Sequence, residues 1–258
     1  MIPNPTQRFT GRVESYRRYR PTYPPAVADL LTRECGLTPK STLADIAAGT
    51  GLLTEIFLAA GFAVIAVEPN DEMRAACAAL EDQYPKLSVR NGTAEATALP
   101  DRSTDLVTVA QAMHWFDLDK TRAEFLRILK PKEKGSGWCA VIYNNRRLGG
   151  DPFHDAYEQL LLEFGIDYAA VKQQHLGRKR LAQFFAPAEM QCATLPNPQA
   201  LTLEALEGRV LSSSYSPQPG HPRFAAMRAA LAHLFSATQS NGVVTMHHDC
   251  VVCYGRLA

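Results

Sequence analysis

The sequence contains no apolar segment long enough to cross a membrane. Its longest uncharged apolar stretch, Ile56–Val67, has 12 residues, whereas a membrane-spanning helix needs about 20. The N-terminal residues also lack the apolar core of a signal peptide, because Pro, Asn, Gln and Arg all occur among the first eight. We therefore expect a cytoplasmic protein that makes no membrane contact.

An excess of charge of either sign is also missing. The 258 residues include 27 Lys and Arg against 26 Asp and Glu, which gives a formal net charge of +1. Proteins that bind nucleic acid or anionic lipid draw much of their affinity from neutralised phosphates, so neither partner is expected. Apolar residues (46%) and charged residues (21%) are close to the averages of globular proteins, which excludes disorder, collagen and coiled coil.

Clustered cysteines are absent as well. Only Cys250 and Cys253 lie close in sequence, with no second pair and no nearby histidine at the spacing of a zinc site. Their segment is predicted to be a strand, in which positions i and i+3 point to opposite faces. We expect no metal site and six ordinary reduced thiols. The other four are Cys35, Cys77, Cys139 and Cys192.

Strand and helix patterns alternate regularly over the first part of the chain. After a helix over Ala26–Cys35 that stops at Gly36, the predicted strands are Thr42–Ala47, Phe62–Val67, Leu87–Asn91, Asp105–Ala110 and Trp138–Tyr143. The predicted helices between them are Leu52–Ala60, Asp71–Gln83 and Leu118–Leu129. This alternation is typical of right-handed βαβ units and a mostly parallel sheet.

The rhythm changes after residue 144. Helices are predicted over Phe153–Phe164, Ala169–Phe185, Leu203–Leu211 and Phe224–Phe235, and strands over Ala193–Leu203 and Val243–Leu257. No internal repeat is present.

A glycine-rich turn follows the first predicted strand, in the segment Leu43–Gly51 (LADIAAGTG). Glycine lets a ligand approach the backbone, and the next helix N-terminus favours negative charge. Glu68, at the end of the following strand, can bind both ribose hydroxyls of a nucleoside. Thr54 stands where a nicotinamide motif needs its third glycine. An adenosyl ligand with an amino-acid tail fits better, because Asp45 can interact with an ammonium group directly or through water.

At this point the sequence resembles the class I S-adenosylmethionine-dependent methyltransferases. The resemblance is strongest to the small-molecule branch that includes trans-aconitate methyltransferase-like and methyltransferase type 11 proteins, and it covers about residues 9–145 well. It is carried by Asp45–Gly51, Val67–Asn70 with Met73, Gly92–Glu95 with Leu99-Pro100, Asp105–Ala110, Gln111–Phe116 and Arg127–Pro131.

The resemblance implies a Rossmann-like methyltransferase fold, an α/β doubly wound, mostly parallel sheet of seven strands whose last strand is antiparallel. It further implies one methyltransferase domain over residues 1–258. Within it we expect an N-terminal lid over residues 1–25 and a helical insertion over residues 146–190 that shapes the acceptor pocket.

The resemblance also implies S-adenosyl-L-methionine as cofactor and a set of residues that bind it. Gly49 and Gly51 would shape the loop under the methionine part, Glu68 would bind the ribose, and Gln111 would lie beside the methionine tail. The full predicted set is Tyr16, Arg20, Asp45, Ala47, Gly49, Gly51, Glu68, Pro69, Met73, Ala94, Glu95 and Gln111.

Two departures from the family pattern stand out. Ala47 occupies a position where the family usually has glycine, which adds a methyl group near the ligand, and Lys132–Gly137 is longer than the usual turn. Three assignments also keep a structural alternative. Asp45 can accept hydrogen bonds from its own loop, Met73 can be core, and Glu95 can be a solvated loop charge.

His114 follows the fourth predicted strand, where the ligand crevice of an open α/β sheet lies. It can act as general base at neutral pH, or it can pack beside the pocket. Trp115 and Phe116 can exclude water from the sulfonium or belong to the core. Methyl transfer is an in-line displacement, so alignment is the main task of the protein. A carboxylate acceptor would need no base at all.

The N-terminal segment is rich in arginine, with Arg8, Arg12, Arg17, Arg18 and Arg20. One hypothesis is a lid in which Tyr16 and Arg20 contact the cofactor or an anionic substrate, with Arg146 and Arg147 completing an anion clamp. The alternative is a solvated basic helix.

We therefore expect an enzyme that transfers a methyl group to a small, carboxylate-bearing metabolite. Two alternatives remain open at this stage. The first is a module that binds S-adenosylmethionine without turnover, and the second is a nucleic-acid methyltransferase that uses the basic N-terminus.

Overall fold

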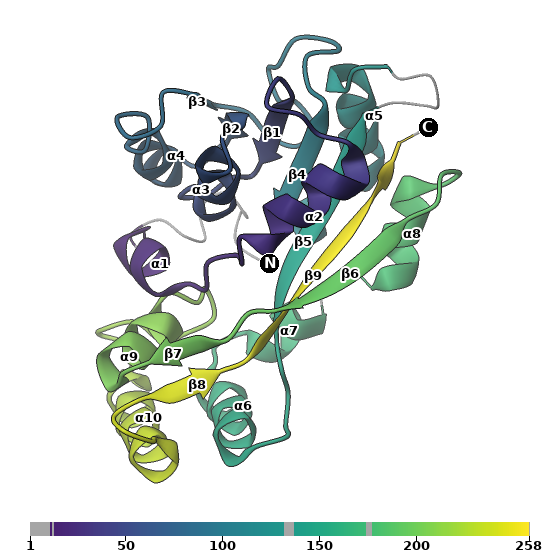
Figure 1. Ribbon diagram of the computed structural model, residues 1–258. Coiled ribbons are helices and arrows are strands. Elements are labelled where there is room, and N and C mark those ends of the chain that lie inside the picture. The colour runs from purple at the N-terminus through teal and green to yellow at the C-terminus, as the bar shows by residue number, and fades with distance from the viewer. Residues whose placement is uncertain (1–10, 12, 132–136, 174–176, 258) are drawn as a thin grey trace.

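The computed structural model describes residues 11, 13–131, 137–173 and 177–257. Its centre is a seven-stranded sheet with the strand order β3-β2-β1-β4-β5-β9-β6 (Figure 1). The strands are β1 (Thr42–Ile46), β2 (Ala63–Val67), β3 (Leu87–Arg90), β4 (Leu106–Ala110), β5 (Trp138–Arg146), β6 (Gln191–Pro196) and β9 (His248–Arg256). The first five are parallel, and β9 lies antiparallel between β5 and β6. The predicted fold class is confirmed.

Helices cover both faces of this sheet because its strands carry apolar side chains on both sides. In β1, Leu43 packs into the core on one face and Ala44 into the core on the other. The helices α2 (Ala26–Cys35), α3 (Leu52–Ala59) and α4 (Asp71–Ala78) contribute to the first core. The helices α5 (Leu118–Ile128) and α8 (Arg178–Phe185) contribute to the second.

Capping residues set several helix ends. Gly36 ends α2 in the left-handed conformation, with φ +63°. The Asn70 side chain accepts a hydrogen bond from the Met73 amide at the start of α4, and Asp117 does the same for Lys120 at the start of α5. Helix α4 is shorter than its predicted 71–83 span. The predicted helix 169–185 is interrupted, so it forms α7 and α8.

A third hydrophobic cluster lies beyond the end of β5 and forms what we call the cap. The cap consists of α6 (Pro152–Phe164), α7 (Tyr168–Gln173), β7 (Gln199–Leu201), α9 (Leu203–Leu211), α10 (Phe224–Thr238) and β8 (Val244–Met246). In Figure 1, β7 and β8 continue the lines of β6 and β9 away from the sheet toward α9 and α10.

The cap differs from the insertion predicted over residues 146–190. Helix α8 falls inside that span but packs on the sheet, where Arg122 of α5 donates to the carbonyls of Phe184 (3.1 Å) and Ala186 (2.9 Å). Conversely, residues 199–246 lie outside the span and belong to the cap. The expected long turn Lys132–Gly137 lies, except for Gly137, outside the described residues.

The expectation of six reduced thiols is wrong for two of them. A disulfide joins Cys192 of β6 to Cys253 of β9, because these residues stand directly opposite each other in the antiparallel ladder with Cα atoms 4.1 Å apart. Cys35, Cys77, Cys139 and Cys250 are free and buried. Cys250 and Cys253 belong to cores on opposite faces, as predicted. No helix among the described residues is long and apolar enough to span a bilayer.

Candidate active site

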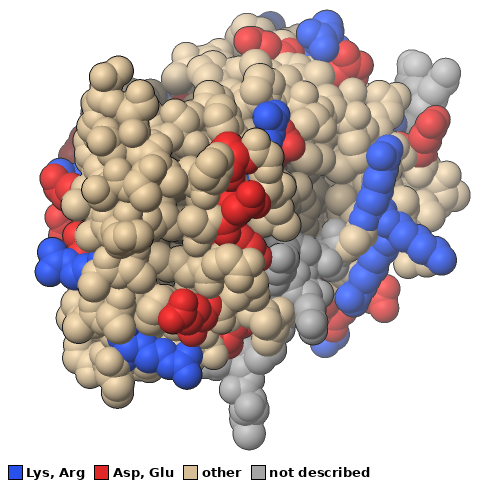
Figure 2. Space-filling view, turned by 90° about the horizontal axis from the view of Figure 1, so that it is seen from below, with Lys and Arg blue, Asp and Glu red and all other residues tan. Residues whose placement is uncertain are grey.

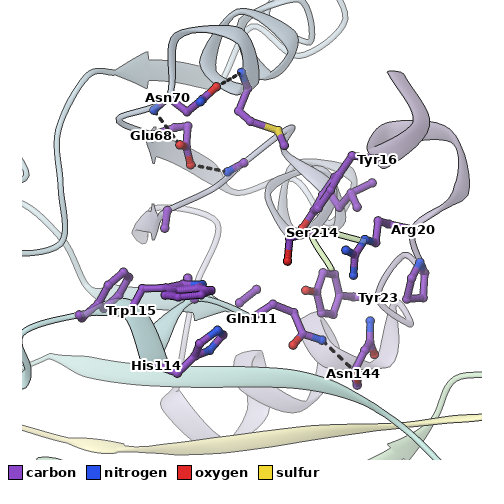
Figure 3. Close-up of a pocket in the computed structure, with 18 of the residues that line it drawn as sticks. Tyr16, Arg20, Tyr23, Glu68, Asn70, Gln111, His114, Trp115, Asn144 and Ser214 are labelled. Carbon is purple, nitrogen blue, oxygen red and sulfur yellow. Dashed lines mark hydrogen bonds between the residues drawn. The ribbon is translucent and has the colours of Figure 1, made fainter. Parts of the chain in front are cut away.

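A cavity of about 540 Å³ opens where the carboxyl ends of β1, β2, β4 and β5 meet the cap, and its size is typical of a small-molecule site. Figure 3 shows Tyr16, Arg20 and Tyr23 on one side of it, across from Glu68 and Trp115. Ten of the twelve predicted cofactor residues and His114 line the cavity. The ten are Tyr16, Arg20, Ala47, Gly49, Glu68, Pro69, Met73, Ala94, Glu95 and Gln111.

Glu68 fastens two loops together at one end of the cavity. Its carboxylate accepts a hydrogen bond from the Gly49 amide (2.9 Å) and another from the Asn70 amide (2.9 Å), shown as dashed lines in Figure 3. The side chain is 7% exposed, and burial raises its pKa although both amides and Arg74 lower it. These bonds fix the carboxylate at the cavity wall, where its remaining lone pairs can accept from a diol.

Residues of the glycine-rich turn have two different surroundings: some line the cavity, and others pack against neighbouring helices. Ala47 and Gly49 both adopt left-handed backbone conformations, with φ +56° and +60°. A Cβ added to Gly49 would meet no atom within 4 Å, so this residue keeps the cavity floor open. Gly51 does not line the cavity, and a Cβ there would lie 2.8 Å from Leu80 Cδ1. Gly51 therefore packs closely against the side chains of Leu80 and Cys77, and its φ of +88° also favours glycine.

Asp45 does not reach the cavity. Its carboxylate accepts hydrogen bonds from Thr54 Oγ1 (2.6 Å) and Thr108 Oγ1 (2.9 Å), and the residue is 1% exposed. Burial raises the pKa of Asp45 to about 6, against the lowering effect of the two threonines. The predicted interaction with an ammonium group is not supported by this position. Asp45 instead braces β1 against α3 and β4.

The predicted adenine-side residues come together along one wall. Met73 and Ala94 are buried apolar residues, each 3% exposed, and both also line the cavity. Glu95 is not a free loop charge, because its carboxylate accepts a hydrogen bond from the Asp117 amide (3.0 Å) at the start of α5. Glu95 thus links the cavity wall to the helix that follows β4.

Gln111 and His114 occupy the centre of the cavity floor in Figure 3. Gln111 has a left-handed backbone (φ +57°), and its side-chain amide donates to the Asn144 carbonyl (3.2 Å). A non-glycine residue in this region costs about 1 kcal/mol or more, and such strain concentrates at functional sites. His114 lies on a short 3₁₀ turn, with its ring 4.6 Å from the Trp115 ring.

Helix α1 (Val13–Tyr19), which we call the lid, contributes Tyr16 to the lining of the cavity. The Arg20 guanidinium lies 4.9 Å from the Tyr16 ring centroid and donates to the Ser212 carbonyl (2.9 Å) of the cap. Arg18 is exposed and pairs with Glu204. Arg8 and Arg12 lie outside the described residues.

The two arginines of the predicted anion clamp lie in different places. Arg146 lines the cavity and its side chain is 11% exposed, whereas Arg147 is half exposed and pairs with Asp249 (2.7 Å) away from the cavity. Arg209 of α9 lines the cavity at 8% exposure. Arg209 was not predicted from the sequence, because one basic residue in the last turn of an amphipathic helix is usually solvated.

Known methyltransferases resemble this chain. Residues 44–134 match the family model described as a methyltransferase domain. An uncharacterized methyltransferase of Schizosaccharomyces pombe is 34% identical over 139 residues, which cover 54% of this chain and 53% of that protein. An uncharacterized methyltransferase of Mycobacterium tuberculosis is 35% identical over 161 residues, which cover 57% and 62%. The chain therefore spans only part of the length of these curated relatives.

Solved structures extend the likeness to the whole fold. A protein assigned as a type II methyltransferase from Anaeromyxobacter dehalogenans has a TM-score of 0.64 at 20% identity, covering 92% of this chain and 97% of that one. One assigned to an antibiotic biosynthesis pathway in Anabaena variabilis also has a TM-score of 0.64, at 19% identity and with 93% and 99% covered. At these identities the likeness shows the fold alone.

Over residues 44–134 the chain therefore matches a methyltransferase domain, and its fold is that of solved methyltransferase structures. The matched residues 44–134 of this methyltransferase domain include the glycine-rich turn, Glu68, Gln111 and His114. The cap and the lid lie outside the matched range. Arg20, Arg146 and Arg209 therefore belong to the part of the methyltransferase that the family model does not describe.

Proposed function

We propose that residues 1–258 act as one methyltransferase unit that transfers a methyl group from S-adenosyl-L-methionine to a small, carboxylate-bearing acceptor. The observation that carries this proposal is the continuity of the cavity. Glu68 and the glycine-rich turn lie at one end, and Arg146 and Arg209 lie at the other. A cofactor and an anionic acceptor can therefore meet without leaving protein cover.

The first end of the cavity suits the cofactor. Glu68 would accept hydrogen bonds from the ribose, Met73 and Ala94 would pack against the adenine, and the open backbone at Gly49 would accommodate the methionine part. When bound, S-adenosyl-L-methionine supplies an electrophilic methyl group on a sulfonium. The fit rests on the buried Glu68 carboxylate and on the space above Gly49.

The central residues would orient the acceptor and exclude water. Gln111 is held by Asn144, so its side chain presents a fixed polar surface at the cavity floor. The rings of His114 and Trp115 pack together beside it and reduce the access of solvent. His114 would accept a proton only from an acceptor that carries one. With a carboxylate acceptor, the His114 ring would only shape the cavity and would take no part in proton transfer.

Two observations favour this function over the alternatives. Two of the arginines that line the cavity, Arg146 and Arg209, are nearly buried, so their charges face the interior and not the bulk solvent. On the face seen in Figure 2, Lys and Arg side chains stand in separate groups among Asp and Glu instead of forming one broad basic surface. Both features suit a small anion better than a nucleic acid.

The test is a pair of measurements on the whole chain. Calorimetry should show binding of S-adenosyl-L-methionine, and Glu68→Gln should weaken it about 10-fold or more, because two hydroxyl hydrogen bonds to a charged acceptor are lost. Glu34→Gln, a change at an exposed residue paired with Arg33, should leave it unaltered. An assay for S-adenosylhomocysteine release across carboxylic acids should then find turnover.

The outcomes separate the candidate functions. Cofactor binding with no turnover on any acceptor would support the binding module in place of the enzyme. Turnover on RNA or DNA with strong salt dependence would support the nucleic-acid methyltransferase. Absence of cofactor binding would contradict the proposed function altogether.

A further inference from the structure

Three guanidinium groups from distant parts of the sequence line the cap end of the cavity. Arg20 follows the lid helix α1, Arg146 ends β5, and Arg209 lies on α9. Each has a buried N–H without a hydrogen-bond partner among the described residues, at Nε of Arg20, Nη1 of Arg146 and Nε of Arg209. A buried donor without a partner is costly, so three around one cavity point to a ligand that accepts from them.

Only one of the three guanidiniums is paired with a carboxylate among the described residues. Arg146 forms an ion pair with Glu158 and also donates to Tyr168 Oη (3.1 Å). Arg20 donates to the Ser212 carbonyl, and Arg209 donates to Ser213 Oγ (3.2 Å), both of which are neutral acceptors. The group therefore keeps a net charge of about +2 after Glu158 is counted.

Among the described residues, no acidic side chain that lines the cavity offsets this charge. The two lining carboxylates are Glu68 and Glu95, and both are bonded to backbone amides in the methyltransferase core. This positive charge also affects the pKa values of nearby groups. Burial, followed by Arg20, lowers the pKa of Arg209, and burial, followed by Arg209, lowers the pKa of His248 to about 3.

Aromatic rings hold two of these three guanidiniums in place. Arg146 lies over the Tyr157 ring at 5.0 Å, and Arg20 lies over the Tyr16 ring. Tyr168 and Tyr215 line the same end of the cavity, with ring centroids 4.9 Å apart. Stacked guanidiniums lose little freedom when they bind, because their planes are already oriented. This end of the cavity is thus prepared for planar or tetrahedral oxyanions.

We propose that Arg20, Arg146 and Arg209 form an anion subsite for two negative charges on the methyl acceptor, with Arg209 as its specificity-determining residue. This inference rests on the proposed function and narrows its substrate class to small dianions. Two carboxylates and one phosphate monoester share the required chemistry, since each presents two charges and several acceptor oxygens. A monoanion of the same size leaves one cation uncompensated.

The test compares probes that differ by one charge. Succinate carries two carboxylates, and succinamate has the same size with one carboxylate replaced by an amide. At about pH 8, where carboxyl groups are ionised, succinate should bind the protein loaded with S-adenosylhomocysteine about 10-fold more tightly or better than succinamate. Inorganic phosphate, titrated in parallel, identifies the kind of dianion. Equal affinities for succinate and succinamate, with no phosphate binding, would overturn the proposal.

Variants assign the effect to Arg209. Arg209→Gln should weaken succinate binding about 10-fold or more and leave the affinity for S-adenosylhomocysteine unchanged. Arg209→Lys keeps the positive charge but loses the paired N–H donors of the guanidinium. Its affinity for succinate should therefore lie between those of Arg209→Gln and the unaltered protein. The matched control is Arg147→Gln, since Arg147 lies outside the cavity and pairs with Asp249. An unchanged succinate affinity in Arg209→Gln would contradict the assigned role.

Two measurements distinguish a failure of the anion subsite from misfolding of a variant and from a failure of the proposed function. The comparison of succinate with succinamate uses the unaltered chain, so it stands even if Arg209→Gln fails to fold. Failure to bind S-adenosylhomocysteine would count against the proposed function. Normal binding of S-adenosylhomocysteine, with no discrimination between the two probes, would overturn the anion subsite alone.

Discussion

The ring of Tyr19 on the lid lies directly against the backbone of Gly208 on α9. A Cβ added to Gly208 would clash with the Tyr19 ring at Cδ2, Cε2 and Cγ, far inside van der Waals contact. The lid is also tied by hydrogen bonds from Tyr19 Oη to Glu204 (3.0 Å) and from the Gln199 side chain to the Tyr19 carbonyl (3.0 Å). The close approach of the two helices therefore depends on glycine at this position.

Gly208→Ala should displace the lid and weaken cofactor binding about 10-fold, because overpacking of this kind costs about 1–3 kcal/mol. Calorimetric titration with S-adenosyl-L-methionine measures the effect. Gly177→Ala is the control, since a Cβ at Gly177 meets no atom within 4 Å. A Gly208→Ala protein that binds the cofactor as tightly as the Gly177→Ala protein would show that the lid does not contribute.

The role of His114 can be read from the choice of acceptor. His114→Ala should have little effect on transfer to a carboxylate, which has no proton to lose. It should reduce turnover of a phenol or amine acceptor by about 10²–10⁴-fold, the usual contribution of a general base. Steady-state rates for each acceptor class measure this difference. A large loss on a carboxylate acceptor would assign the ring a positioning role instead.

The buried Asp45 carboxyl makes stability depend on pH. Its pKa is raised by burial from 3.8 in the unfolded chain to about 6, so the folded state binds the extra proton between these values. Relative to Asp45→Asn, the natural chain should therefore lose up to about 3 kcal/mol of stability as pH rises from about 4 to above 6. Urea unfolding of both proteins at several pH values tests this. A constant difference between the two proteins would contradict it.

The Cys192–Cys253 disulfide closes a long loop, with a sequence separation of 61. Reduction should lower the free energy of unfolding by about 2–4 kcal/mol, because the unfolded chain regains freedom. Urea unfolding with and without dithiothreitol gives the value. The double variant Cys192→Ser/Cys253→Ser serves as the control and should not respond to the reductant. Equal midpoints for the natural chain in both conditions would rule out a stabilising disulfide.

The sheet was predictable because its signals are local. Each parallel strand is an apolar run, and each helix end has its own cap, such as Gly36 or Asn70. The meeting of Glu68 and Gly49 at one end of the cavity was predictable for the same reason. Glu68 and Gly49 lie 19 residues apart in adjacent βα loops, and their hydrogen bond joins neighbours in the fold that are also near in sequence.

The cap end of the cavity was not predictable to the same extent, because it is assembled from distant segments. Arg20 and Ser212 are 192 residues apart, and no sequence spacing announces their contact. Arg209 has the sequence pattern of a surface residue, yet the folded chain leaves it 8% exposed. The disulfide between Cys192 and Cys253 follows from the register of β6 on β9, which the cysteine spacing did not reveal. Asp45 matched the sequence pattern of a ligand-binding residue, yet in the fold its carboxylate is hydrogen-bonded to Thr54 and Thr108 and does not reach the cavity.

The second part of the cap departs from the sheet and returns to it at adjacent points. Pro196 at the end of β6 is paired with Asp249 near the start of β9, and the Asn197 amide donates to the His248 carbonyl (2.9 Å). Residues 198–247 thus form a cassette whose two ends meet on neighbouring strands. Such a segment can be exchanged between related chains without moving the strands that carry Glu68 and the glycine-rich turn. Under the proposed function, acceptor choice and the role of Arg209 in it could therefore change without altering the residues proposed to bind the cofactor.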